Sequence, residues 1–79
     1  MSGRLGRLAI NDDGFLFDPM TGESFTVNGA GALIIKSLKE GKSAPQTAEA
    51  LMASFEASHQ EAERDVNDFL GHLRALKLI

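Results

Sequence analysis

The sequence of 79 residues contains no cysteine, tryptophan or tyrosine. Without cysteine the chain can form neither disulfides nor thiolate metal sites, and it has no cysteine nucleophile. Long hydrophobic runs are also missing, because no purely apolar stretch is longer than the four residues from Ala32 to Ile35. Neither a signal peptide nor a membrane-spanning helix is therefore predicted. We expect a soluble protein of the reducing cytoplasm with no membrane partner.

Positive charge is scarce as well. Eight lysine and arginine residues stand against eleven aspartate and glutamate residues, which gives a net charge of −3. A surface that binds nucleic acid needs clustered lysine and arginine, whereas these basic residues are scattered, so no nucleic-acid partner is expected. The hydrophobic content of 43% is that of a globular protein. A chain this short supports one hydrophobic core, and residues 1–79 are expected to form a single domain.

The first third of the sequence predicts a three-stranded antiparallel meander. Short apolar runs are separated by turns rich in Asn, Asp, Pro and Gly. Strands are expected at residues 5–10, 15–17 and 23–27, with turns at residues 11–14 and 18–22.

Side-chain alternation along the second and third strands predicts their buried face. Because side chains alternate with a period of two, apolar residues at odd positions are expected to share the face that packs on the core. These residues are Phe15, Phe17, Phe25 and Val27. Ser24 and Thr26 are then expected to point outward.

Two helices are predicted in the middle of the sequence. Asn28 is a good N-cap for a first helix over residues 29–39, and Gly41 is expected to end it. Ser43 and Gln46 have the spacing of a capping box, which predicts the start of a short second helix.

A third, longer helix is expected after a break at residues 56–59. Apolar residues recur at helical spacing from Ala62 until the helix ends near Lys77, which leaves Leu78 and Ile79 as an apolar tail. Strands followed by helices predict an α+β fold. A three-stranded antiparallel sheet followed by three helices is the composition of a winged helix-turn-helix-like domain.

Catalytic and metal-binding patterns are weak. Asn11, Asp12 and Asp13 offer oxygen ligands, but their spacing does not fit a calcium loop. His59 and His72 are accompanied by no further zinc-ligand pattern. The predicted third helix carries acids that suit a solvated helix face better than acid–base catalysis, namely Glu61, Glu63, Asp65 and Asp68. We therefore expect no enzyme activity, no metal and no cofactor.

The third strand is a candidate binding element. If it lies at the edge of the sheet, it presents unpaired backbone N–H and C=O groups, which accept an extended peptide by β-augmentation. If the chain covers its own edge, no such site exists. The residues alone leave both arrangements open.

The order and spacing of several short motifs resemble the PqqD-like family over about residues 7–79. In the front half they are residues 14–19, residues 25–28 with Gly31, and residues 38–43. In the back half they are Asp65 and Val66, Phe69 and Leu70, Leu73, and the terminal Leu78 and Ile79. The Phe-Asp-Pro and Thr-Gly-Glu-Ser-Phe segments are more similar to a stand-alone subgroup found with HPr-kinase-like proteins, the HPr-rel-A-associated subgroup, than to the PqqD of pyrroloquinoline quinone (PQQ) biosynthesis.

The resemblance implies a peptide chaperone, a recognition element for ribosomally made and modified peptides (a RiPP recognition element), on a winged helix-turn-helix fold. In that family a leader peptide adds as a strand beside the third strand and touches the third helix. A modifying enzyme, often a radical SAM protein, then receives the precursor. On this chain the resemblance implicates the backbones of Ser24, Phe25, Thr26 and Val27. It also implicates the side chains of Arg64, Asp65, Asp68 and His72, of which Asp65 falls on the family motif and the others are its helical neighbours.

Two other functional classes remain open. A DNA-binding winged-helix regulator would share the fold, although four acids against two arginines on the third helix would repel phosphate. A small carrier or regulatory subunit would also be short and acidic, but an Asp-Ser-Leu-like attachment motif is missing and Ser37 lies inside the first predicted helix. The sequence names neither the precursor peptide nor an oligomeric state.

Overall fold

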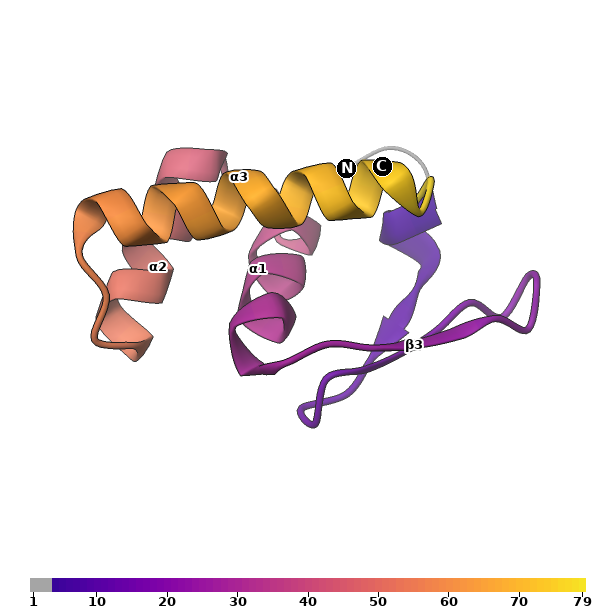
Figure 1. Cartoon of the computed structure of the whole chain (residues 1–79). Coiled ribbons are helices and arrows are strands. Elements are labelled where there is room, and N and C mark those ends of the chain that lie inside the picture. The colour runs from indigo at the N-terminus through magenta and orange to yellow at the C-terminus, as the bar shows by residue number, and fades with distance from the viewer. Residues whose placement is uncertain (1–3) are drawn as a thin grey trace.

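The computed structural model describes residues 4–79 (Figure 1). A short 3-10 helix, three strands and three α-helices follow one another along this part of the chain. Their bounds are η1 Arg4–Arg7, β1 Ala9–Ile10, β2 Phe15–Phe17, β3 Ser24–Thr26, α1 Gly29–Lys39, α2 Ala44–Ser54 and α3 His59–Ala75. The strands form one antiparallel sheet in the order β1-β2-β3. The predicted α+β fold, a three-stranded sheet followed by three helices, is confirmed.

Helix α3 organises the arrangement of the other elements. Figure 1 shows it running along one side of the molecule, with α1 beneath it, α2 crossing behind it and the sheet beneath its C-terminal half. Both α1 and α2 pack against α3. The N-terminal end of α1 follows β3 after two residues, so the sheet, α1 and α3 meet at that corner of the molecule.

The first strand is shorter than predicted, because residues 5–7 belong to η1 and the strand begins at Ala9. Leu5 and Leu8 are both almost fully buried. Residues three positions apart point to opposite faces of a strand, but they lie on the same side of a 3-10 helix. A 3-10 turn therefore allows both leucines to enter the core, which an extended chain would prevent.

The predicted buried face of β2 is wrong. The register pairs Leu16 with Phe25, and directly opposite residues in an antiparallel pair share a face. Leu16 is 1% exposed and packs in the core with Phe25, whereas Phe15 and Phe17 are 45% and 41% exposed. The two phenylalanines of β2 thus lie on the outer face of the sheet with the exposed Ser24 and Thr26 of β3, the two residues predicted to point outward.

Side chains of three N-cap residues fix the starts of the helices. The Asn28 side chain accepts a hydrogen bond from the Gly31 N–H at 2.8 Å, as predicted for α1. The predicted capping box of Ser43 and Gln46 forms at the start of α2. A second capping box, between Ser58 and Glu61, starts α3 at His59 inside the predicted break. The spacing Ser-x-x-Glu is a helix-start signal that the sequence analysis overlooked.

The core joins both ends of the described chain. Its buried side chains come from η1, β2 and all three helices and include Leu5, Leu16, Ile35, Val66 and Leu73. Leu78 is also fully buried, and its carbonyl oxygen accepts a hydrogen bond from the Leu5 N–H at 2.9 Å. The residues that the sequence analysis left as an apolar tail therefore close the core against the N-terminal segment.

Candidate functional site

Within residues 4–79, β3 is an edge strand of the sheet. Two hydrogen bonds flank the paired residues of β2 and β3. The Asp18 N–H donates to the Glu23 carbonyl and the Val27 N–H donates to the Gly14 carbonyl, each at 2.8 Å. Because hydrogen-bonded and non-hydrogen-bonded pairs alternate along an antiparallel ladder, Phe25 exchanges its bonds with Leu16. The residues on either side of Phe25 turn their N–H and C=O groups away from β2.

The open edge therefore consists of the backbone groups of Ser24 and Thr26. Both residues are exposed, and each presents one donor and one acceptor to a neighbouring strand. Phe25 and Val27, which the resemblance also implicates through their backbones, direct their N–H groups toward β2 instead. Among the four implicated residues, Ser24 to Val27, the structure thus distinguishes two edge residues from two that hold this segment against β2.

Gly14 allows β2 and the end of β3 to approach closely. It has a φ of +84°, a conformation that favours glycine, and a Cβ atom at this position would collide with the Val27 carbonyl oxygen. This close approach accompanies the hydrogen bond from the Val27 N–H to the Gly14 carbonyl. Gly14 thereby helps to set where β3 ends and α1 begins.

The buried carboxylate of Asp18 fixes the turn between β2 and β3. It accepts hydrogen bonds from Arg4 Nε at 3.1 Å, from Arg7 Nε at 3.3 Å and from the Met20 N–H at 2.9 Å. Burial raises the pKa of Asp18, but the hydrogen bonds from Arg7, Met20 and Arg4 outweigh it and hold the pKa well below its ordinary value. Arg4 also donates to Glu23, immediately before β3. The edge strand is therefore anchored to η1.

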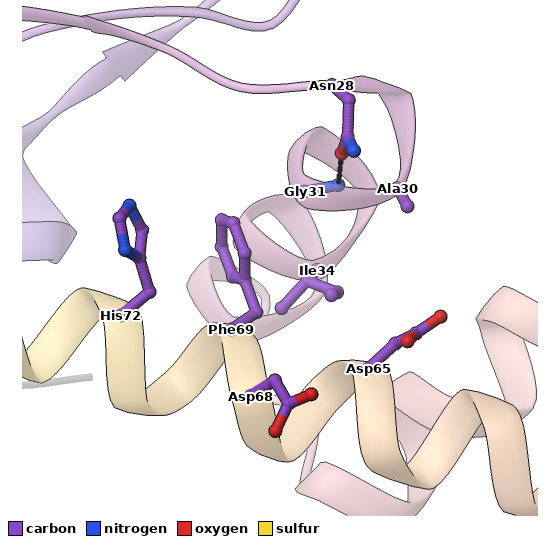
Figure 2. A pocket seen from close by; sticks show the side chains of 8 residues that line it. All are labelled: Asn28, Ala30, Gly31, Ile34, Asp65, Asp68, Phe69 and His72. Atoms are coloured by element: carbon purple, nitrogen blue, oxygen red, sulfur yellow. Dashed lines mark hydrogen bonds between the residues drawn. The ribbon is translucent and has the colours of Figure 1, made fainter.

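A hollow of about 310 Å³ lies between the start of α1 and the middle of α3 (Figure 2). The α1 side contributes Asn28, Ala30, Gly31 and Ile34, and α3 contributes Asp65, Asp68, Phe69 and His72. The four α3 residues have the spacing i, i+3, i+4 and i+7, which places them on one face of a helix. Asn28 follows β3 after one residue, so the hollow opens where the edge strand ends.

The wall of the hollow is apolar where α1 approaches α3. A Cβ atom on Gly31 would lie 2.9 Å from Phe69 Cε1 and 3.0 Å from Val27 Cβ, so only glycine leaves room for the phenyl ring there. Ile34, three residues further along α1, is also buried. The rings of Phe69 and His72 lie 6.2 Å apart at 42°, and Figure 2 shows both rising from α3 on the side of the segment that leads into α1.

The structure brings together three of the four predicted side chains. Asp65, Asp68 and His72 line the hollow, whereas Arg64 is exposed on the neighbouring part of the helix surface and does not line it. Five other residues that were not predicted from the sequence also line the hollow, namely Asn28, Ala30, Gly31, Ile34 and Phe69. Phe69 could have been found, because it lies four residues after Asp65 on the same predicted helix face.

Neither a metal site nor a membrane-spanning helix is found in the part of the chain that is described. Residues 4–79 contain no group of three or more His, Cys, Asp or Glu side chains placed to hold a metal ion. Within the same residues, no helix combines the length and the apolar character needed to cross a membrane.

The chain is similar in sequence and in fold to two solved structures. A lasso peptide synthetase B1 complexed with the leader peptide has 30% sequence identity to this chain and a TM-score of 0.75, over 90% of this chain and 85% of that one. TbiB1 in complex with the TbiA(beta) leader peptide has 32% identity and a TM-score of 0.77, over 90% and 84%. No curated protein matches the sequence. The family model of coenzyme PQQ synthesis protein D (PqqD) matches residues 13–79. The chain therefore belongs to the PqqD family, which confirms the resemblance seen in its sequence.

Proposed function

We propose that this domain binds the leader segment of a ribosomally made precursor peptide as an additional strand beside β3. The observation that supports the proposal is the open edge at Ser24 and Thr26, which continues into the hollow between α1 and α3. Similar structures with 30% and 32% identity are complexes with leader peptides. An edge strand beside a hollow meets the two requirements of β-augmentation, because main-chain bonds give affinity and side-chain pockets give specificity.

The pairing geometry of β3 defines how such a peptide would lie. Its main chain would exchange hydrogen bonds with Ser24 and Thr26. Its residue opposite Phe25 would point to the same face as Phe25, toward the helices, while the residues opposite Ser24 and Thr26 would point outward. The inward residues would meet the hollow lined by Phe69 and His72. The domain would thus contact every second side chain of the peptide and leave the side chains between them pointing outward.

The domain would contribute binding rather than catalysis. A captured leader holds the remainder of the precursor near a separate modifying enzyme and raises its effective concentration there. Membership of the PqqD family supports a radical SAM-type protein as that enzyme. Because the precursor is made on ribosomes, we place this exchange in the cytoplasm.

A proline at position 26 tests the proposed strand addition. Thr26→Pro removes an N–H that points away from β2, so the fold loses no ladder hydrogen bond while a bound strand loses one. The probe is a fluorescein-labelled peptide of about 15 residues, selected from a random-sequence display library against the domain. We expect the Kd, measured by calorimetry, to rise about threefold to tenfold, the equivalent of one hydrogen bond.

Thr26→Val serves as the matched control because it changes the side chain and keeps the N–H. Its Kd should stay near that of the original domain, and circular dichroism should show both variants folded. Equal affinity of Thr26→Pro and Thr26→Val would contradict strand addition. Failure of the library to yield any peptide that binds would contradict the peptide-binding function itself.

A further inference from the structure

The hollow beside β3 combines an apolar wall with an acidic one. Phe69 and Ile34 form the apolar part, and the carboxylates of Asp65 and Asp68 lie next to them on the face of α3 (Figure 2). None of the described residues that line the hollow is a lysine or an arginine. The ion pairs formed within residues 4–79 also leave out both aspartates. A ligand in the hollow would therefore meet two carboxylates that no cation of the described chain neutralises through an ion pair.

The position of these two acids on α3 is not explained by helix capping. Acidic side chains complement the helix dipole within the first turn, and Glu61 fills that role in the capping box with Ser58. Asp65 and Asp68 lie beyond the first turn of a helix that begins at His59. They lie on the face of α3 that lines the hollow, where their charge acts on a bound ligand.

The start of α1 offers a weaker opposing charge. The N-terminal end of a helix carries about half a positive charge, and the Asn28 side chain already accepts the hydrogen bond of the Gly31 N–H there. Two full negative charges on the α3 side outweigh this partial one. The electrostatic field of the hollow therefore favours a cation over an anion.

The length of the hollow accommodates more than one inward side chain of an added strand. Asp65 and His72 are separated by about 10 Å along the helix at 1.5 Å per residue. Inward side chains of a strand repeat about every 6.6 to 6.8 Å. One inward residue can thus face Phe69 and His72 while the next, two positions away, faces the aspartates.

We propose that the peptide segment captured beside β3 carries a lysine or arginine directed at Asp65 and Asp68, two positions from an apolar residue that packs on Phe69. The inference rests on the proposed peptide-binding function and specifies its ligand. A long basic side chain suits both walls, because its methylene stem covers apolar surface while its charged end reaches the carboxylates. Arginine can in addition pair with a carboxylate through two parallel hydrogen bonds.

The test compares peptides selected from a random 15-residue display library by the original domain and by Asp65→Asn/Asp68→Asn. Both aspartates are exposed, so the double variant should fold. Peptides selected by the original domain should share a Lys or Arg at one fixed position, two residues from an apolar one. Replacing that cation with Gln should weaken binding about tenfold in the original domain and leave the Kd nearly unchanged in the double variant.

A control variant separates the position of the charges from net charge. Glu49→Gln/Glu56→Gln removes the same two charges from exposed residues that do not line the hollow, and it should retain the full preference for the cation. Peptides whose binding depends on the Thr26 N–H but which share no cation would overturn the inference and leave strand addition standing. An equal effect of the Gln replacement in the original domain and the double variant would overturn it too. A library without binding peptides would overturn both proposals.

Discussion

At the scale of single residues, Gly31 gives the hollow its shape because Phe69 occupies the space where a side chain would stand. A Cβ atom there would lie 2.9 Å from Phe69 Cε1. We expect Gly31→Ala to lower the free energy of unfolding by about 1 to 3 kcal/mol, the usual effect of overpacking, although alanine is the better helix former. Urea denaturation measures the change.

Gly71 provides the matched control on α3. Nothing lies within 4 Å of a Cβ atom built at this position, so Gly71→Ala should raise the free energy of unfolding by about 0.5 to 1 kcal/mol. The two substitutions are chemically identical and differ in what surrounds them. A Gly31→Ala domain as stable as the Gly71→Ala domain would show that Phe69 can move aside without cost.

Asp18 makes the stability of the domain depend on pH. Hydrogen bonds from Arg7, Met20 and Arg4 hold its pKa below the ordinary value, so as the pH falls the unfolded chain binds a proton first. The stabilisation is therefore complete above an unfolded pKa of about 4 and is lost as the pH falls toward the folded pKa. Asp18→Asn removes the charge, and we expect a lower Tm than the original domain at pH 7.

The difference in Tm between the original domain and Asp18→Asn should narrow between pH 5 and pH 3. Circular dichroism melts at several pH values in this range measure it. Asp13→Asn is the control, because Asp13 is an exposed turn residue. Its replacement should change Tm little at any pH in this range. A Tm difference that stays constant down to pH 3 would contradict the role of the Asp18 charge.

At the scale of elements, the register of β2 against β3 decides which side chains face the core. Leu16 is buried opposite Phe25, and Phe17 is 41% exposed on the outer face. We expect Leu16→Ala to cost about 2 to 5 kcal/mol of unfolding free energy. Phe17→Thr should stay within about 1 kcal/mol, since threonine suits an exposed strand position. Denaturant midpoints that rank the two variants in the opposite order would support the alternation expected from the sequence.

The outcome for β2 shows where sequence patterns were insufficient. Phe15, Leu16 and Phe17 are all large and apolar, so a strand of three such residues carries no alternation that identifies its inner face. The turn that closes with the hydrogen bond from the Asp18 N–H to the Glu23 carbonyl sets the register. The helices were more predictable, because Asn28 and Ser43 are local capping signals that act independently of tertiary contacts.

The candidate site was predictable in part, because helical periodicity is also a local pattern in the sequence. Helical spacing groups Asp65, Asp68 and His72 on one face, and the structure places them around one hollow. Periodicity could not show that Arg64 lies outside this hollow, nor that Gly31 lies within it, because both depend on how α1 and α3 pack. That these residues bind a peptide stays a prediction until the binding experiments are made.

At the scale of the whole molecule, the edge strand and the hollow depend on a core that joins the two ends of the described chain. Lys77 has a φ of +60°, which turns the chain after α3 so that the Leu78 N–H donates to the Leu73 carbonyl. This is the hydrogen bond of a Schellman motif, and it brings an apolar residue back onto the helix. No glycine marks the turn in the sequence, which is why Leu78 was expected to be a tail rather than core.

Leu78 therefore contributes to the free energy of unfolding, which for a chain of 79 residues is only about 4 to 12 kcal/mol. It is fully buried, whereas Leu76, two residues earlier, is 36% exposed. We expect Leu78→Ala to cost about 2 to 5 kcal/mol and to lower Tm by about 10 °C or more. Leu76→Ala, the same substitution on the surface, should shift Tm by only a few degrees. Thermal melts of both variants that agree within error would contradict the closing role of Leu78, because the hydrogen bond between the Leu78 carbonyl and the Leu5 N–H would then hold the ends together without the side chain.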